Sequence, residues 1–290
     1  MRTLAIDIGG TKFTVGAFDE DSLIARETRS TDRTGGPRSM LGAIREIYSK
    51  WSRELDFHPN ACGIGFGGPV DFRTQTVTLS THVGGWDQYP LVPEIAELTG
   101  APTVMDNDAN LGALGEAYYG AAKETESSFY MTLSTGIGGG IIINRSVYRG
   151  IDSFAGEIGH MNLVPDGPSC LCGSHGCFER MCCGLWLERD YGKTAKELLL
   201  DAEFVKSYVV YLARGLKAAL MILNPEMIVI GGGISKAGDR LFVPLREELE
   251  RQMPPWSRAR RVIEPARLGD YSVLYGALVL ASTADGSRPA

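Results

Sequence analysis

Apolar residues recur along the chain in short runs that are bounded by glycine or by polar turns, and this pattern predicts alternating strands and helices. Strands are predicted over residues 4–8, 15–18, 103–105, 129–133, 140–143 and 227–230, with another that ends near Gly65. Helical spacing of apolar positions predicts helices over residues 42–51, 91–98, 107–119, 203–223 and 272–281. Two similar sets of strands and helices with glycine-rich turns predict an α/β protein with two lobes around a cleft.

The lobes are expected to divide near residue 107. Residues 1–107 would form a small N-terminal lobe, and a C-terminal helix over about 272–290 would pack back on it. Residues 108–271 would form a large lobe that carries the cysteine-rich loop 160–177. A chain of 290 residues is long enough for two domains with separate cores.

Composition and charge narrow the range of functions. Hydrophobic residues make up 44% of the chain and charged residues 22%, as in soluble globular proteins. The net charge of −6 gives no basic surface for nucleic acid, so no nucleic-acid partner is expected. No apolar run is long enough to cross a membrane and no secretory leader precedes the first strand, so we expect a cytoplasmic protein without membrane contact. In that setting clustered cysteines favour a metal site over disulfides.

The first of three glycine-rich turns reads Asp7-Ile8-Gly9-Gly10-Thr11-Lys12 and lies between two predicted strands. Glycine lets the backbone approach a phosphate closely, and Thr11 and Lys12 carry donors for its oxygens. Asp7 at the strand end is a candidate magnesium ligand, directly or through water. An ordinary hairpin turn is the alternative, because glycine pairs are common there.

The other two turns lie in the second half of the chain. One contains Thr135, Gly136, Gly138, Gly139 and Gly140, and its density of glycine predicts a nest of backbone N–H groups for an anion. The third turn contains Gly231, Gly232 and Gly233, which leave room for a flat ring against the backbone. The spacing fits neither a Rossmann fingerprint nor a P-loop.

The stretch from residue 156 to 179 carries the strongest candidate chemistry. Three thiolates and one imidazole form a closed tetrahedral shell for zinc, and a closed shell is usually structural. Two histidines compete for the imidazole position, and nearness in sequence to the cysteines favours His175 over His160. Two glutamates flank the cysteines, so the metal would hold polar groups toward a ligand. The residues concerned are Cys170, Cys172 and Cys177 with Glu157 and Glu179.

The motifs DIGGTK, NDAN, STGIGGG, GEIGH, CxCGxxGC and GGGIS occur in this order. The set resembles the ROK family of bacterial sugar kinases and related repressors, from Ala5 to about Ala277. The resemblance implies the actin-like ATPase (ribonuclease H-like) fold, with nucleotide and sugar in the cleft between the lobes.

The resemblance also implies a role for each motif. The first two glycine turns would hold the ATP phosphates with Mg²⁺, and the third would lie by the adenosine. Asp108 would be the general base, because phosphoryl transfer needs one carboxylate to accept the hydroxyl proton; a plain helix N-cap is the alternative for this aspartate. The sugar would be bound by Asn107, Asp108, Glu157, His160 and Glu179, with Gly67 and Gly68 lining its pocket. The zinc ligands would be His160, Cys170, Cys172 and Cys177, which favours His160 over His175.

The expected activity is that of an ATP-dependent kinase acting at the 6-OH of a hexose or N-acetylhexosamine, with glucose as the first choice, in a homodimer. A polyphosphate donor and a sugar-independent ATPase switch are alternatives. A sugar-sensing ROK regulator is another, but such proteins carry a DNA-binding domain before the first strand, and only three residues precede Leu4 here. Ser134, Gly67 and Ser153 differ from the residues usual in the family, and these differences bear on substrate preference.

Overall fold

The computed structural model describes residues 1–32, 34–78 and 84–284, which fall into two compact units. Unit 1 contains Met1–Tyr118, Arg149–Phe154 and the chain from Tyr271 onward, and unit 2 contains Tyr119–Tyr148 and Ala155–Asp270. The division differs from the one expected, because residues 108–118 and 149–154 belong to unit 1. Residues 285–290 of the expected C-terminal helix lie outside the described part.

Unit 1 is built on a five-stranded sheet in the order β3-β2-β1-β4-β7. Its elements are β1 (Arg2–Ile8), β2 (Lys12–Asp19), β3 (Ser22–Ser30), α1 (Gly36–Glu54), β4 (Ala61–Phe66), β5 (Val70–Asp71), β6 (Thr76–Val77), α2 (Leu91–Thr99), β7 (Thr103–Asn107), α3 (Asp108–Tyr119) and α9 (Ser272–Ala284). Strands β1, β4 and β7 are parallel, and β1 to β3 form an antiparallel meander.

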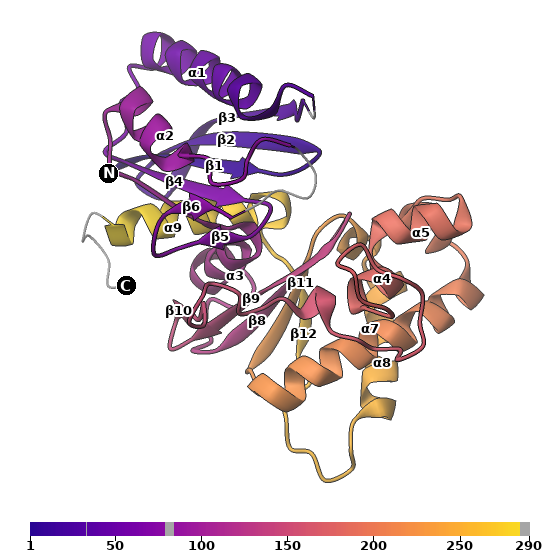
Figure 1. Cartoon of the computed structure of the whole chain (residues 1–290). Coiled ribbons are helices and arrows are strands. Elements are labelled where there is room, and N and C mark those ends of the chain that lie inside the picture. The colour runs from indigo at the N-terminus through magenta and orange to yellow at the C-terminus, as the bar shows by residue number, and fades with distance from the viewer. Residues whose placement is uncertain (33, 79–83, 285–290) are drawn as a thin grey trace. The chain divides into compact units, whose positions relative to one another are not determined.

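The two faces of this sheet carry different residues because side chains alternate along each strand. Leu4, Ile6 and Ile64 pack with α1 and α2 in one core cluster. The opposite face carries small residues, so that α9 approaches the backbone closely: a Cβ on Gly63 would collide with the carbonyl oxygen of Ala277. Figure 1 shows α1 and α2 on one side of the sheet and α9 on the other.

Helix α3 lies in unit 1 because it packs closely against α9. A Cβ on Gly276 of α9 would collide with the carbonyl oxygen of Leu111, and one on Gly115 of α3 would collide with that of Ser272. The Ser272 hydroxyl also donates to the buried Glu116 carboxylate at 2.7 Å. These contacts place the lobe boundary after α3 rather than before it.

Unit 2 contains a second five-stranded sheet, in the order β10-β9-β8-β11-β12. Helices α7 and α8 bury their apolar faces in its core cluster together with residues of β8 and β11. The elements are β8 (Ser128–Leu133), β9 (Ile137–Ile143), β10 (Ser146–Val147), η1 (Ile158–His160), α4 (Phe178–Cys182), α5 (Gly184–Tyr191), α6 (Ala195–Leu198), α7 (Ala202–Leu223), β11 (Met227–Gly231), η2 (Ile234–Ala237), α8 (Asp239–Gln252) and β12 (Ile263–Pro265). In the part of the chain that the structure describes, no helix has the length and apolarity that crossing a bilayer requires.

Candidate active site

In unit 1 the first glycine turn, the Gly67–Gly68 pair and the start of α3 lie at the carboxyl ends of the parallel strands. The parallel register pairs Asp7 with Gly65 and Gly65 with Asp106, so β1, β4 and β7 end side by side. The carboxyl ends of parallel strands are where α/β proteins place their binding residues. This end of the sheet therefore gathers the predicted magnesium ligand Asp7, the predicted base, and the glycine turn up to Lys12 that is predicted to bind phosphate, which we call the phosphate turn.

Gly67 joins these parts. Its N–H donates to the carbonyl oxygen of Ile8 at 2.8 Å. A Cβ placed on Gly67 would lie 3.3 Å from Oδ2 of Asp108 and 3.4 Å from the Cα of Gly9. The carboxylate of Asp108 and the phosphate turn thus flank the same glycine, and a larger residue there would crowd both.

Asn107 rather than Asp108 caps helix α3. Oδ1 of Asn107 accepts the N–H of Ala109 at 2.9 Å, and its Nδ2 donates to the carbonyl oxygen of Gly68 at 3.0 Å. The capping function that offered an alternative explanation for Asp108 therefore belongs to its neighbour. Because both polar atoms of the Asn107 side chain bind the protein, a sugar hydroxyl would be left with the second N–H of this amide.

The phosphate turn between β1 and β2 is braced by the residue that follows β3. Within the turn, the N–H of Gly9 donates to the carbonyl oxygen of Lys12 at 3.0 Å. The hydroxyl of Thr31 donates to the carbonyl oxygen of Gly9 at 2.8 Å, and its N–H donates to that of Thr11 at 2.9 Å. The side chains of Thr11 and Lys12 are exposed. Sequence reasoning missed Thr31, which stands among polar residues with no pattern of its own.

The second glycine turn is shorter than the sequence indicated. Only residues 134–136 form the turn, and Gly138, Gly139 and Gly140 lie within β9, paired with β8. Their backbone is part of an antiparallel ladder, which corrects the expectation of a loop-like nest. The need for glycine comes from close approach: a Cβ on Gly139 would lie 2.6 Å from the carbonyl oxygen of Gly156 and 2.7 Å from the ring of Phe129.

The second and third glycine turns lie together in unit 2. Strand β11 pairs with β8 in parallel, with Gly231 opposite Thr132. Gly232 has φ +86°, and a Cβ there would lie 2.5 Å from the carbonyl oxygen of Leu133. The turn around Ser134 also accepts the first N–H groups of α5: that of Gly184 donates to the Ser134 carbonyl oxygen at 2.7 Å. Ser134 does not have a positive φ, so serine fits without strain where glycine is usual.

Glu179 connects the cysteine-rich loop to the glycine hairpin. Its Oε2 accepts the N–H of Ile137 at 2.9 Å, and a Cβ on Gly136 would lie 2.7 Å from the same oxygen. Glu157 directly precedes η1, and its Oε2 lies 3.9 Å from Nε2 of His160. Burial raises the pKa of Glu157 although 42% of its side chain stays exposed; the His160 charge opposes this shift and the Glu179 charge adds to it.

His160, Cys170, Cys172 and Cys177 form a group whose ligand atoms all lie within 4.8 Å of one another. The Sγ atoms of Cys172 and Cys177 are 3.6 Å apart, and two sulfurs bound tetrahedrally to zinc at about 2.3 Å would be about 3.8 Å apart. Cys170 and Cys172 lie on one tight turn, in which the N–H of Gly173 donates to the carbonyl oxygen of Cys170 at 3.1 Å. The donor set therefore fits zinc.

The other histidine plays a different part in this loop. The carbonyl oxygen of His175 accepts from Nδ2 of Asn162 at 2.6 Å, while its imidazole is not among the grouped ligand atoms. Of the two candidates left by the spacing of the sequence, the structure places His160 with the cysteines.

The thiols of this group have shifted acidity. Burial and the hydrogen bonds that the Cys177 thiol donates to Cys172 and Cys170 raise the pKa of Cys177 to about 12, and burial raises that of Cys170. Burial also opposes ionisation of Cys172, but the N–H of Ser174 and the two other thiols together lower its pKa. A metal ion must therefore displace protons from at least Cys170 and Cys177 when it binds at neutral pH.

Similar proteins place these residues in a family context. The sequence model of the ROK family matches residues 3–284, a stretch that contains every candidate residue above. A glucokinase of Thermotoga maritima is 32% identical over 312 aligned residues, covering 97% of each chain. An N-acetylmannosamine kinase of Vibrio cholerae is 31% identical over 82% of this chain and 85% of its own. A solved structure of a ROK family glucokinase from Streptomyces griseus in complex with glucose and AMPPNP is 28% identical, with a TM-score of 0.83 over 98% of this chain and 100% of that one.

Proposed function

The chain belongs to the ROK family and is a sugar kinase with the actin-like ATPase fold, and we propose that it phosphorylates the 6-OH of a hexose or N-acetylhexosamine with ATP. Glucose is the first sugar to test, because a glucokinase is similar over nearly the whole chain. The N-acetylmannosamine kinase is almost as similar, so N-acetylated sugars belong in the same test.

One observation carries the proposal: the carboxylate of Asp108 lies beside the phosphate turn of unit 1. A single glycine, Gly67, separates Oδ2 of Asp108 from the backbone of Gly9. A base that accepts a hydroxyl proton must lie near the phosphoryl group that this hydroxyl attacks. The position of Asp108 beside this turn, at the start of a helix capped by Asn107, supports its role as that base.

Unit 2 would supply the other contacts to the same substrates. Thr135, Gly136 and residues 231–233 would face the nucleotide, and Glu157, His160 and Glu179 would bind sugar hydroxyls. A sugar presents several hydroxyls that each donate and accept, and carboxylates with an imidazole complement them.

Two metals complete the proposal. Asp7 would hold Mg²⁺ with the ATP phosphates, directly or through water, and the ion would neutralise charge on the transferred group. Zinc bound by His160 and the three cysteines would be structural, because four protein ligands leave no open position. We also expect a homodimer, which light scattering on the purified protein would test.

The test is ADP release over a panel of glucose, mannose, fructose, N-acetylglucosamine and N-acetylmannosamine, with polyphosphate as an alternative donor. Asp108→Asn should lower kcat by roughly 10²–10⁴-fold while sugar binding, followed by calorimetry, persists. Asp19→Asn, which changes an exposed carboxylate of the same unit, is the matched control. Near-normal kcat in Asp108→Asn, or a product phosphorylated away from C6 by NMR, would contradict the proposal.

A further inference from the structure

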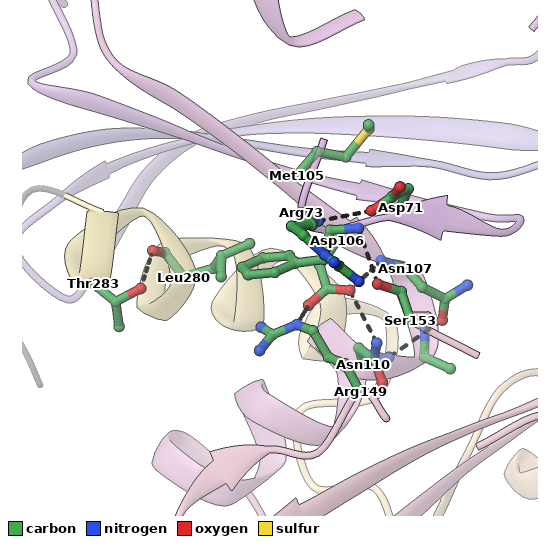
Figure 2. Close-up of polar contacts among 12 residues, drawn as sticks. Asp71, Arg73, Met105, Asp106, Asn107, Asn110, Arg149, Ser153, Leu280 and Thr283 are labelled. Carbon is green, nitrogen blue, oxygen red and sulfur yellow. Dashed lines mark hydrogen bonds and ion pairs between the residues drawn. The ribbon is translucent and has the colours of Figure 1, made fainter. Parts of the chain in front are cut away.

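Asp106, directly before the predicted sugar and base residues, is a buried carboxylate with a complete set of partners. Only 1% of it is exposed. Its Oδ1 accepts the N–H of Asn107 at 2.7 Å and Nδ2 of Asn110 at 2.9 Å, and its Oδ2 accepts Nε of Arg149 at 2.7 Å (Figure 2). A buried charge is tolerated when it is paired and hydrogen-bonded in this way.

The guanidinium of Arg149 is itself fixed. It lies 3.7 Å from the centroid of the Phe72 ring, and 22% of the side chain is exposed. A planar guanidinium that both stacks on a ring and pairs with a carboxylate is held in one orientation.

Arg149 begins a short segment, Arg149–Phe154, that belongs to unit 1 although the chain on both sides of it belongs to unit 2. We call it the docked segment. Two further bonds hold it: Nη2 of Arg73 donates to the carbonyl oxygen of Ile151 at 2.9 Å, and the N–H of Phe72 donates to Oγ of Ser153 at 3.1 Å. Ser153 has φ +62°, a conformation that favours glycine, and its hydroxyl supplies a contact that glycine lacks.

The residues that receive the docked segment are tied to β7. Nε2 of Gln75 donates to the carbonyl oxygens of Phe72 and Met105, and its Oε1 accepts the N–H of Met105 at 2.6 Å. Phe72 is therefore fixed relative to the strand that ends at Asn107. The docked segment, the turn at Phe72 and the end of β7 form one connected assembly.

We propose that Asp106 and Arg149 are positioning residues for the reaction, which set the location of Asp108 and Asn107 without touching substrate. Asp106 binds the residues on both sides of Asp108, namely the backbone of Asn107 and the side chain of Asn110 in the first turn of α3. Arg149 pairs with Asp106 at 2.7 Å and orients its carboxylate, and so holds the first turn in place.

The proposal rests on the proposed function, in which Asp108 is the base. It can be told apart from a purely structural role because the two roles affect different measured quantities. A structural ion pair would change the melting temperature and leave kcat per folded molecule unchanged. Misplacement of a catalytic group by about 1 Å costs roughly 10²-fold in rate. Positioning therefore predicts a loss of kcat and a higher KM for sugar, with the KM for ATP unchanged.

The test compares Arg149→Met, Arg149→Lys, Asp106→Asn and the double variant Asp106→Asn/Arg149→Met. Arg29→Met is the matched control, because Arg29 lies in the same unit, is 34% exposed and pairs with Glu27 at 2.7 Å. All are assayed well below their melting temperatures with the best sugar substrate. We expect Arg149→Met to lower kcat roughly 10²-fold, Arg149→Lys to recover part of the loss, and Arg29→Met to match the unaltered protein within about twofold.

The two residues should also act as a unit, so the double variant should be no slower than the slower single variant. Additive losses, or a kcat for Arg149→Met within threefold of Arg29→Met, would overturn the inference. If Arg149→Met does not fold, Asp106→Asn decides, because a kcat within threefold of Arg29→Met would then overturn the inference. Asp108→Asn is run alongside: if it stays active, the proposed function fails and this inference with it, whereas an inactive Asp108→Asn beside a fully active Arg149→Met refutes the inference alone.

Discussion

Replacing His160 and His175 separately tests the metal site most directly. The imidazole of His160 lies with three thiols whose ligand atoms are within 4.8 Å of one another, whereas His175 contributes a backbone oxygen to the loop. Structural zinc sites bind with about 10–16 kcal/mol, so one of four ligands accounts for about 2.5–4 kcal/mol. His160→Ala should therefore weaken zinc binding by roughly 10²–10³-fold. His175→Ala keeps the backbone acceptor and should retain zinc.

The assay measures zinc per chain after gel filtration and the zinc Kd by competition with a chromophoric chelator. Sugar KM is then determined at limiting and at saturating zinc. Saturating zinc should restore the metal to His160→Ala but leave its sugar KM raised, because the imidazole that would contact the sugar is absent. Equal zinc loss in the two variants, or full zinc retention by His160→Ala, would refute the ligand assignment.

Three further predictions follow from single contacts. Zinc affinity should fall at least ~100-fold for each unit that pH drops below 7, because the raised pKa values of Cys170 and Cys177 require at least two protons to be displaced on binding. A pH-independent Kd in competition titrations would argue against thiolate ligands. Thr31→Val removes the 2.8 Å hydrogen bond to the carbonyl oxygen of Gly9, which should cost the folded turn about 0.5–1.5 kcal/mol of stability. The KM for ATP should therefore rise several-fold while the KM for sugar stays unchanged. Steady-state kinetics in which only the KM for sugar rises would contradict this role of Thr31. Gly276→Ala should lower the free energy of unfolding by about 1–3 kcal/mol because its Cβ would meet the backbone of α3; an unchanged urea midpoint would show that α9 can move away.

Local sequence was sufficient to predict a strand where an apolar run ends at a turn. The strands predicted over residues 4–8, 129–133 and 227–230 are confirmed as β1, β8 and β11. Strand β3 was not predicted, because every second residue is exposed and only one of the half-buried residues between them, Leu23, is large and apolar. Helix α8 was not predicted either, since Pro244 inside it reads as a helix breaker.

Local sequence patterns do not reveal contacts between residues that are distant in the chain. The glycines of β9 were attributed to an anion nest, but Gly139 is required by the approach of Gly156 and Phe129. The pair of Asp106 and Arg149 joins residues 43 positions apart, and neither side chain stands out in its own neighbourhood. The choice between His160 and His175 could not be made from spacing for the same reason, because the loop folds His160 back onto cysteines ten or more residues away.

The connection from the zinc ligands to the glycine hairpin explains why a closed metal shell can matter for catalysis. Cys177 is both a candidate ligand and the residue that precedes α4, and Glu179 stands in the first turn of that helix. The carboxylate of Glu179 accepts the N–H of Ile137 immediately after the turn at residues 134–136. An ion that fixes Cys177 therefore fixes the start of α4, and through Glu179 it also fixes one end of β9. A metal with no open coordination position can thus act on the hairpin proposed to bind phosphate as well as on the carboxylate proposed to bind sugar, since a single side chain belongs to both.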